Sequence, residues 1–310
     1  MAIVFFGTPQ FAIPSLKALI ASGEDIAAVV TRKDAAKGRG KKTLPPPVKE
    51  LALSHGLNVL QPSSMKDPAF LSTLKSINPE FIVVVAYGRI LTDDILSAPS
   101  IAPVNVHASL LPKYRGASPI AWAILNGEKV TGVTTMIITR ELDTGDILLQ
   151  ESTPISDEDT TATLSSRLSE MGADLLIKTL KGLREGKITP KPQTGESNYA
   201  PPLKKEDGLI NWDRTSGQLH DFIRGMSPWP GAFTFLEGER LIITRAAAVP
   251  GKSGQGKPGV IEKTRDELLA GTKEGFLRIL EIQPEGKKPM DAKAFLAGRH
   301  INIGRAFSNA

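Results

Sequence analysis

The spacing of apolar residues changes character about half-way along the chain. In the first half, short runs of β-branched and aromatic residues alternate with segments in which apolar residues recur every three or four positions. This alternation predicts strands separated by helices, as in repeated βαβ units. We expect the strands at 3–6, 26–31, 58–60, 81–86 and 104–107. The intervening helices are expected at 15–22, 48–53, 69–77, 93–96 and 119–125.

The strand expected at 81–86 is apolar at every position, with the sequence Phe-Ile-Val-Val-Val-Ala. A strand of this kind is buried on both faces, which is typical of parallel sheets covered by helices on both sides. The fold class expected for residues 1–187 is therefore α/β, with a Rossmann-like, open and mostly parallel sheet. Two further strands at 130–138 and 147–153, and a helix at 161–182, complete this domain.

Beyond residue 187 the pattern is different. Residues 188–206 are rich in proline and polar side chains and have no period, so they are expected to form a linker. After them come short strands separated by turn residues, as in a small antiparallel, OB-like β-barrel, which we assign to 207–310. These strands are expected at 232–236, 240–247, 259–262, 267–270 and 276–282, and a last helix at 291–297.

The composition is that of an ordinary globular protein with two domains. The chain has 310 residues, of which 41% are hydrophobic and 23% charged, and this length exceeds the ~100–200 residues of one typical core. It has no cysteine, which excludes disulfides, thiolate metal sites and cysteine nucleophiles. The first residues lack a basic leader, and no run of ~18 apolar residues follows. We therefore expect a cytoplasmic protein that does not span a membrane.

The positive charge is concentrated in one segment. Residues 31–50 contain seven Lys and Arg against one Asp and one Glu, a net charge of +5 that equals the net charge of the whole chain. Such a basic segment on a near-neutral protein favours a polyanionic partner, because neutralising phosphates releases their condensed counterions. A solvated loop without a partner would have the same composition.

The most unusual stretch runs from Val104 to Pro119, where an expected strand ends and a loop begins. In open α/β sheets, ligands bind beyond the carboxyl ends of the strands. Asn105 and His107 are two positions apart on the strand, so both side chains project from the same face. Such a pair suits acyl transfer, because an amide N–H can stabilise a tetrahedral oxyanion while an imidazole donates a hydrogen bond or relays a proton. A histidine at a strand end also occurs as a purely structural residue.

A carboxylate can reach the same edge of the sheet from the loop between the next two strands. Asp143 lies there, within Arg140-Glu-Leu-Asp-Thr-Gly-Asp146. Beside His107, it would orient the imidazole and favour the charged form of the ring. Aspartate shortly before glycine is also common in turns that have no chemical role.

These residues together resemble the folate-dependent formyltransferases. In that family an Asn-x-His pair precedes Ser-Leu-Leu-Pro-x-Tyr-Arg-Gly, here Ser109 to Gly116, and a downstream Leu-Asp-x-Gly supplies an aspartate. The resemblance implies that Asn105, His107 and Asp143 are catalytic. It also implies that 10-formyltetrahydrofolate donates the formyl group and that no metal ion takes part. The residues that would line the folate site or border the pterin are Ser109, Leu110, Leu111, Pro112, Val84, Ala86 and Tyr87.

The rest of the chain resembles the members of this family that act on initiator methionyl-tRNA. Residues 38–49 look like the basic insertion with which those enzymes enter the acceptor stem, and 6–12, 222–232 and 288–298 are similar as well. The resemblance implies that the 207–310 domain binds tRNA, and we expect a monomer. The residues that would hold tRNA phosphates are Arg39, Lys41 and Lys42.

Three alternatives remain open at this point. A formyltransferase that acts on an amino-sugar nucleotide would share the catalytic stretch, but the basic insertion at 38–42 argues against it. A dinucleotide-binding oxidoreductase would need Gly-x-Gly-x-x-Gly after the first strand, where only Gly7 is present, and an acid after the second, where Thr31-Arg32 stands. An RNA-binding protein without catalysis would leave the Asn-x-His pair and the aspartate unexplained.

Overall fold

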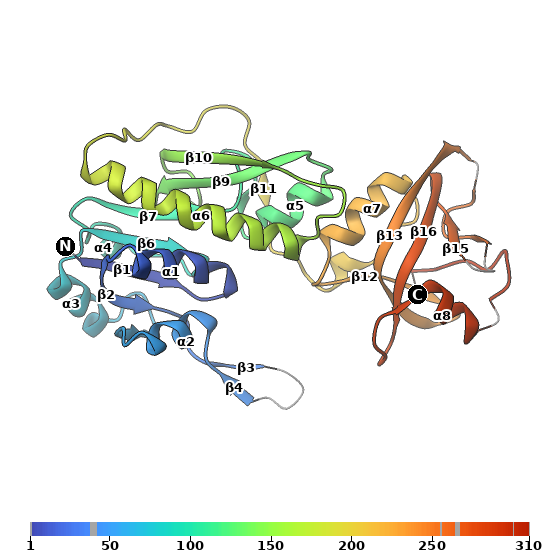
Figure 1. Ribbon diagram of the computed structural model, residues 1–310, viewed down its shortest axis with the longest axis horizontal. Coiled ribbons are helices and arrows are strands. Elements are labelled where there is room, and N and C mark those ends of the chain that lie inside the picture. The colour runs from blue at the N-terminus through green and yellow to red at the C-terminus, as the bar shows by residue number, and fades with distance from the viewer. Residues whose placement is uncertain (1, 38–41, 255, 264–266, 300, 310) are drawn as a thin grey trace. The chain divides into compact units, whose positions relative to one another are not determined.

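The strands in the first part of the chain form one open sheet (Figure 1). The computed structural model describes residues 2–37, 42–254, 256–263, 267–299 and 301–309. The strands of this sheet are β1 (Ala2–Gly7), β2 (Asp25–Val30), β5 (Val59–Leu60), β6 (Phe81–Val85), β7 (Ala102–His107), β9 (Val130–Ile137) and β10 (Ile147–Pro154). Within the described residues they lie in the order β10-β9-β7-β6-β1-β2-β5. The first five of these strands along the chain run parallel, whereas β9 is antiparallel to β7.

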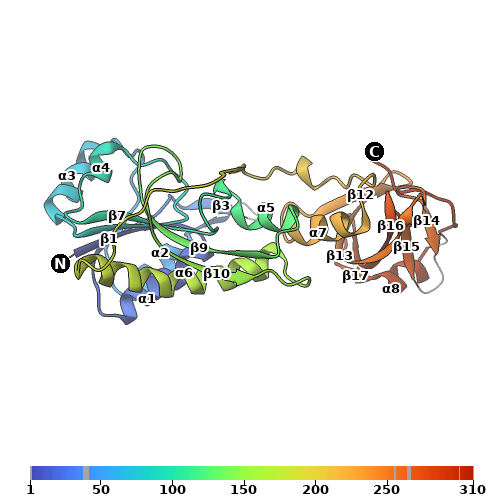
Figure 2. The same cartoon turned by 90° about the horizontal axis from the view of Figure 1, so that it is seen from above.

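Helices cover both faces of this sheet. The helices α1 (Ile13–Ala21), α2 (Pro47–Ser54) and α6 (Thr161–Arg184) pack on one face, and α3 (Pro68–Ile77) and α4 (Asp93–Leu96) pack on the other. Figure 2 shows α1 and α6 on the opposite side of the strands from α3 and α4. Val83 of β6 lies in the same core as Leu176 of α6, whereas the next residue, Val84, lies in the core that contains Phe70 of α3. The prediction of a Rossmann-like α/β sheet from fully apolar strands is therefore confirmed.

Two of the helices begin at a proline. Pro47 opens α2 and Pro68 opens α3, and Asp67 caps α3 by accepting a hydrogen bond from the Ala69 N–H at 3.0 Å. Proline is tolerated in the first helical turn because its missing N–H would have no intrahelical partner there. These starts lie within one residue of the predicted ones.

The basic segment forms a hairpin that the charge pattern did not predict. Strands β3 (Ala35–Lys37) and β4 (Lys42–Leu44) pair antiparallel. Of the predicted tRNA-binding residues, Arg39 and Lys41 lie outside the described residues, and the side chain of Lys42 is not described either. The two strands are hard to recognise because they are three residues long and contain Ala and Lys, which have low strand propensity, so no apolar alternation is visible.

By its internal contacts the chain divides into two compact units, and each is described by itself. The first unit comprises residues 1–119, 130–153 and 165–200, and the second comprises 120–129, 154–164 and 201–310. Among the helices that the structure describes, none is long and apolar enough to cross a membrane.

The second unit contains an antiparallel sheet packed against helices. Its strands are β12 (Ala232–Leu236), β13 (Glu239–Ser253), β14 (Ile261–Lys263), β15 (Leu268–Gly271), β16 (Glu274–Pro284) and β17 (Met290–Asp291). The order is β12-β13-β16-β15-β14, and β17 pairs with β16. The helical elements beside this sheet are α5 (Pro119–Leu125), η2 (Glu206–Gly208), α7 (Ser216–Gly225) and α8 (Ala292–Ala297). A further short helix, η1 (Gln10–Ala12), belongs to the first unit. The predicted antiparallel β domain after a Rossmann-like sheet is confirmed, whereas α7 was not predicted.

Residues 188–200, within the segment that the sequence marks as a linker, belong to the first unit and pair with other segments of it. We call them the strap. Lys191 and Ile147 exchange two backbone hydrogen bonds of 2.8 and 2.9 Å. Further on, β11 (Tyr199–Ala200) runs parallel to β8 (Arg115–Gly116), which lies in the loop after β7. The strap therefore lies beside the stretch that carries the candidate chemistry.

Candidate active site

The end of β7 presents two polar side chains at the carboxyl edge of the sheet. Val104 and Val106 lie in the core beneath α1 and α6. Side chains alternate along a strand, so Asn105 and His107 occupy the other face. His107 is buried, at 6% exposure, and Asn105 is partly exposed. The predicted common face of the two residues follows from this register.

One nitrogen of the His107 ring is held by the backbone. Nε2 lies 2.9 Å from the carbonyl oxygen of Tyr114. A carbonyl oxygen can only accept a hydrogen bond. Nε2 therefore carries a hydrogen and donates a hydrogen bond to the Tyr114 carbonyl. This bond leaves Nδ1 as the ring nitrogen that can exchange a proton with a reacting group.

Asp143 comes close to that second nitrogen. Its Oδ2 atom lies 3.7 Å from Nδ1 of His107, and both side chains are largely buried. The same Oδ2 accepts a hydrogen bond from the Gly116 N–H at 2.8 Å. Asp143 has φ 54°, a left-handed conformation that is uncommon for a residue other than glycine. The structure thus brings the predicted carboxylate to the predicted imidazole from a separate loop of the chain.

Among the described residues, the side-chain amide of Asn105 has no hydrogen-bond partner. The neighbouring strand places Val84 directly beside Asn105 in the sheet. A partly exposed amide at the edge of a sheet can direct its N–H groups to a bound oxygen.

The predicted folate-lining residues differ strongly in exposure. The Ser109 hydroxyl is fully buried and donates to the Lys113 carbonyl at 2.6 Å, and Leu111 is 3% exposed. Both residues build the loop after β7, and only Leu110 and Pro112 of that group are partly exposed. Their contact with folate stays a prediction.

The residues expected to border the pterin show the same contrast. Val84 and Tyr87 are buried, and the Tyr87 hydroxyl lies 3.7 Å from the Met65 sulfur. Burial raises the pKa of Tyr87, so this hydroxyl stays protonated. Ala86, between them, is exposed and has φ 47° at the end of β6. Ala86 is therefore the member of this group that a ligand at the sheet edge can reach.

The basic hairpin is fixed at its base by three polar side chains. Lys49 Nζ donates to both oxygens of Asp34 at 2.8 and 2.9 Å and to Gln61 Oε1 at 2.9 Å. The hydrogen bonds from Lys49 and Gln61 lower the pKa of Asp34. Gln61 also donates to the Arg32 carbonyl at 2.7 Å, directly before the hairpin. Strand β4, which begins at the predicted tRNA-binding residue Lys42, thus belongs to a hairpin with a defined anchor.

Several residues that hold the site were not predicted. Gly116 and Tyr114 form hydrogen bonds with the side chains of Asp143 and His107, whereas Gln193 and Asn198 reach the same loops from the strap. One signal was present, since two amide residues stand in a stretch otherwise rich in proline and charge. That signal does not reveal which loop each amide reaches.

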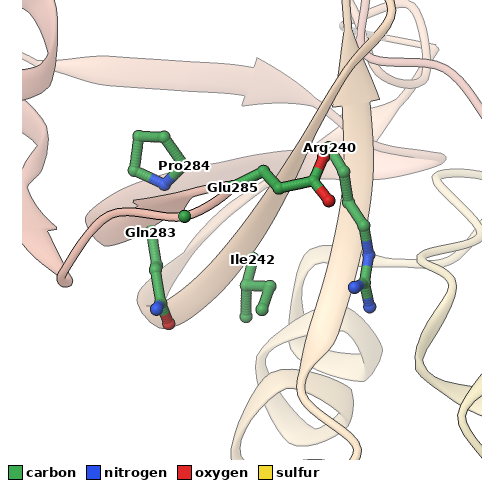
Figure 3. A pocket seen from close by; sticks show the side chains of 6 residues that line it. Arg240, Ile242, Gln283, Pro284 and Glu285 are labelled. Atoms are coloured by element: carbon green, nitrogen blue, oxygen red, sulfur yellow. The ribbon is translucent and has the colours of Figure 1, made fainter. Parts of the chain in front are cut away.

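A hollow on the second unit is separate from this chemistry. It has a volume of about 100 Å³ and is lined by residues of β13, by the end of β16 and by the turn that follows β16 (Figure 3). The lining residues are Arg240, Ile242, Gln283, Pro284, Glu285 and Gly286. None of the predicted site residues contributes to it.

In the described residues there is also no group of three or more His, Asp or Glu side chains arranged to hold a metal ion.

Two family models match the chain and together span most of it. Residues 1–180 match the model described as formyl transferase, and residues 202–300 match the model of the formyl transferase C-terminal domain. The chain belongs to the formyl transferase family. This membership confirms the resemblance inferred from the Asn-x-His stretch and makes the chain a formyl-group transferase, which rules out the dinucleotide-binding alternative.

Two bacterial formyltransferases are similar to this chain over almost its whole length. The methionyl-tRNA formyltransferase of Thermodesulfovibrio yellowstonii is 56% identical over 302 residues, which is 97% of each chain. The methionyl-tRNA formyltransferase of Caldanaerobacter subterraneus subsp. tengcongensis is 51% identical over 306 residues, which is 98% of this chain and 99% of the other.

Solved formyltransferase structures share the fold at much lower identity. A crystal structure of WlaRD, a sugar 3N-formyl transferase, superposes with a TM-score of 0.69 at 21% identity and covers 93% of this chain and 99% of its own. HypX from Aquifex aeolicus in complex with tetrahydrofolic acid has a TM-score of 0.63 at 16% identity, over 97% of this chain and 50% of that chain. At these identities the likeness concerns the fold alone.

Proposed function

We propose that this formyltransferase moves the formyl group of 10-formyltetrahydrofolate to the free α-amino group of initiator methionyl-tRNA, and so makes N-formylmethionyl-tRNA. The observation that carries the proposal is the approach of the Asp143 carboxylate to within 3.7 Å of His107, on the sheet edge that also presents Asn105. The 56% identity to a methionyl-tRNA formyltransferase supports the choice of acceptor.

The proposed chemistry is direct transfer between two nitrogens. The α-amino nitrogen forms a bond to the formyl carbon, whose oxygen becomes a tetrahedral oxyanion. The Asn105 amide N–H stabilises this oxyanion, as does a protonated Nδ1 of His107. When the intermediate collapses, the bond between the formyl carbon and N10 of the folate breaks. The proton lost by the amine balances the proton gained by N10, so no further reactant is consumed.

In this proposal His107 exchanges protons with the reacting groups, and Asp143 stabilises the protonated ring. Because Nε2 of His107 is bound to the Tyr114 carbonyl, the ring exchanges protons at Nδ1. The Asp143 carboxylate at 3.7 Å stabilises the ring whenever Nδ1 is protonated. Its fixed bond to the Gly116 N–H prevents the carboxylate from turning away.

The folate donor fits the same edge of the sheet. In our proposal Ala86, Leu110 and Pro112 contact the pterin and its surroundings, because these residues are accessible at the ends of β6 and β7. Val84, Tyr87, Ser109 and Leu111 support that surface from below, in agreement with their burial. The division of labour between residues 1–187 for transfer and 207–310 for tRNA binding is part of the same proposal.

The basic hairpin is proposed to hold the phosphates of the tRNA acceptor stem. Arg39, Lys41 and Lys42 bring positive charge to this part of the sequence. Electrostatic contacts of this kind set affinity and orientation without doing chemistry. The anchor of Lys49 on Asp34 gives the hairpin a fixed starting point on the first unit.

A formylation assay tests the proposal. The protein is incubated with 10-formyltetrahydrofolate and methionyl-initiator tRNA, and the α-amino group is analysed for formylation. We expect rapid formylation of this tRNA by the wild type and formylation slower by about 10²–10⁴ with His107→Ala. A dTDP-linked amino sugar is the control acceptor, since the structural neighbours include a sugar formyltransferase. A higher kcat/KM for the sugar than for the tRNA would overturn the assignment of methionyl-tRNA as the acceptor. We further expect a cytosolic monomer, which light scattering checks.

A further inference from the structure

The strap sends an amide side chain to the loop that carries Asp143. Gln193 Nε2 donates to the carbonyl oxygens of Asp143 and Gly145, both at 2.8 Å. Its Oε1 accepts from Nε and Nη2 of Arg115 at 3.1 and 2.7 Å. Both N–H groups of the amide are used, and its oxygen accepts two bonds. The amide therefore has one orientation, and this orientation ties the Asp143 backbone to a guanidinium.

A second amide of the strap supports His107. Asn198 Oδ1 accepts a hydrogen bond from the Tyr114 N–H. The carbonyl oxygen of Tyr114 in turn accepts a hydrogen bond from His107 Nε2 at 2.9 Å. Asn198 thus acts on the imidazole through one intervening residue, Tyr114.

The two residues that receive these amides need such support. Asp143 has φ 54° and Tyr114 has φ 60°. The left-handed region is unfavourable for residues with a Cβ atom, and it persists where surrounding contacts hold it. Left-handed backbone occurs here at the two positions that orient the carboxylate and the imidazole.

Backbone pairing alone would suffice to attach the strap. Lys191 pairs with Ile147, and β11 pairs with β8, so the segment is anchored on both sides of Gln193. The Gln193 amide takes part in neither of these backbone pairings. It contacts instead the two carbonyl groups that flank Thr144, in the turn that aims the Asp143 side chain.

We propose that the strap is a positioning element of the reaction site, in which Gln193 sets Asp143 and Asn198 sets His107. The inference rests on the formyl transfer proposed above. Neither amide touches a substrate, so both act on the rate of transfer through the groups that they hold. The two positions demand opposite chemistry: position 193 must donate hydrogen bonds to carbonyls, whereas position 198 must only accept one.

This difference gives a test with conservative variants. Gln193→Glu keeps the size of the side chain and an acceptor for Arg115 but removes both N–H donors and sets an anionic oxygen against two carbonyls. We expect kcat to fall by roughly 10- to 100-fold, as for a catalytic group displaced by about 1 Å. KM for both substrates should stay within about two-fold at temperatures where the variant is folded, because the new carboxylate still accepts hydrogen bonds from Arg115. Asn198→Asp keeps the acceptor and should retain kcat, whereas Asn198→Ala should lose it.

The matched control is Thr194→Ala, an exposed residue of the strap whose side chain forms no bond within the described residues. It should match the wild type in kcat and in thermal midpoint. A strap that only anchors the chain would give Gln193→Glu normal kcat once it is folded, and that result would overturn the inference. If Gln193→Glu fails to fold, the comparison of Asn198→Asp with Asn198→Ala decides: equal kcat values in the two would overturn it.

The failure of the inference and the failure of the proposed function are distinguishable. If the wild-type enzyme does not formylate methionyl-tRNA, the proposed function is refuted. If the wild-type enzyme formylates methionyl-tRNA and the Gln193→Glu variant is fully active, only the positioning role is refuted.

Discussion

Nδ1 of His107 lies 3.7 Å from Oδ2 of Asp143, while Nε2 on the opposite edge of the ring donates to the Tyr114 carbonyl. The two nitrogens therefore have different environments. The backbone fixes one, and the Asp143 carboxylate faces the other. A ring held in this way can pass a proton at one defined atom, which is what transfer between two amines requires.

Removal of the imidazole should slow formyl transfer strongly without weakening tRNA binding. For His107→Ala we expect kcat to fall by about 10²–10⁴, the range for removal of a general acid–base group. The tRNA dissociation constant should be unchanged, because the residue is buried and does not contact phosphates in our proposal. Single-turnover kinetics and a filter-binding titration measure the two quantities. A normal kcat would refute the role of His107.

Neutralising Asp143 tests the charge separately from the loop structure. Asp143→Asn keeps an oxygen that can accept from the Gly116 N–H, so the loop should stay in place. We expect kcat to fall by roughly 10² or more, because the imidazolium loses its counter-charge. The control is Glu141→Gln, the same chemical change on an exposed residue two positions earlier. Equal kcat values for the two variants would argue against an electrostatic role for Asp143.

Removing the charges of the hairpin should weaken tRNA use and leave chemistry intact. With Gln at Arg39, Lys41 and Lys42, we expect a higher KM for methionyl-tRNA and an unchanged KM for the folate. The slope of log affinity against log salt should become shallower by up to about 0.7–0.9 for each phosphate that the protein no longer neutralises. Kinetics at several salt concentrations measure this slope. The control is a triple Gln variant of the exposed residues Lys17, Lys66 and Lys75, which should keep the wild-type slope.

The close approach of Gly116 to the strap predicts a large effect of one methyl group. Gly116 has φ +116°, and a Cβ there would lie 2.6 Å from Tyr199 Cε2 and 2.7 Å from the Ala200 carbonyl oxygen. Gly116→Ala should lower the free energy of unfolding by about 2–4 kcal/mol. In contrast, a Cβ at Gly217 in α7 would meet no other described side chain or backbone segment within 4 Å, and Gly217→Ala should raise stability by about 0.5–1 kcal/mol. Urea titrations should show shifts of opposite sign.

His220 predicts how the stability of the second unit depends on pH. Burial lowers the pKa of His220 below its ordinary 6.5, and the charge of Arg224 adds to this effect. Asp221, Asp157 and Glu158 partly oppose it. The unfolded chain then binds a proton more readily than the folded one, so this contribution is complete above pH 6.5 and is lost as the pH falls toward the lower pKa of the folded state.

Thermal unfolding of the wild type and of His220→Gln checks this sign. Between about pH 7 and about pH 5 the wild type should lose more stability than the variant, because only the wild type gains a proton on unfolding at that position. Equal losses in both proteins would mean that other groups account for the acid sensitivity.

Strand periodicity was enough to predict the first sheet and half of the site. The apolar run of β6 identified a buried parallel strand, and a spacing of two placed Asn105 and His107 on one face of β7. The approach of Asp143 depended on where β9 lies in the sheet, which no local pattern encodes. The resemblance to a family supplied that step.

The groups that hold the site were beyond the reach of pattern. Gln193 and Asn198 reach their partners across 50 and 84 residues of sequence, from a segment without periodicity. Helix α7 was missed for a local reason: its capping box, Thr215 with Gln218, precedes a helix that soon runs into Ser227-Pro-Trp-Pro230, and the prolines dominate the pattern. A hydrogen bond made by one side chain leaves no repeat in the sequence, so it becomes visible only in three dimensions.

The strap also has a consequence for the order in which the protein becomes active as the ribosome makes it. Asn105, His107 and Asp143 leave the ribosome before the amides that fix them, which follow 50 residues after Asp143 and 84 after Tyr114. A nascent chain that ends before the strap holds every reactive group and lacks their supports. Activity should therefore arise only after synthesis has passed Ala200, beyond which the rest of the chain belongs to the second unit.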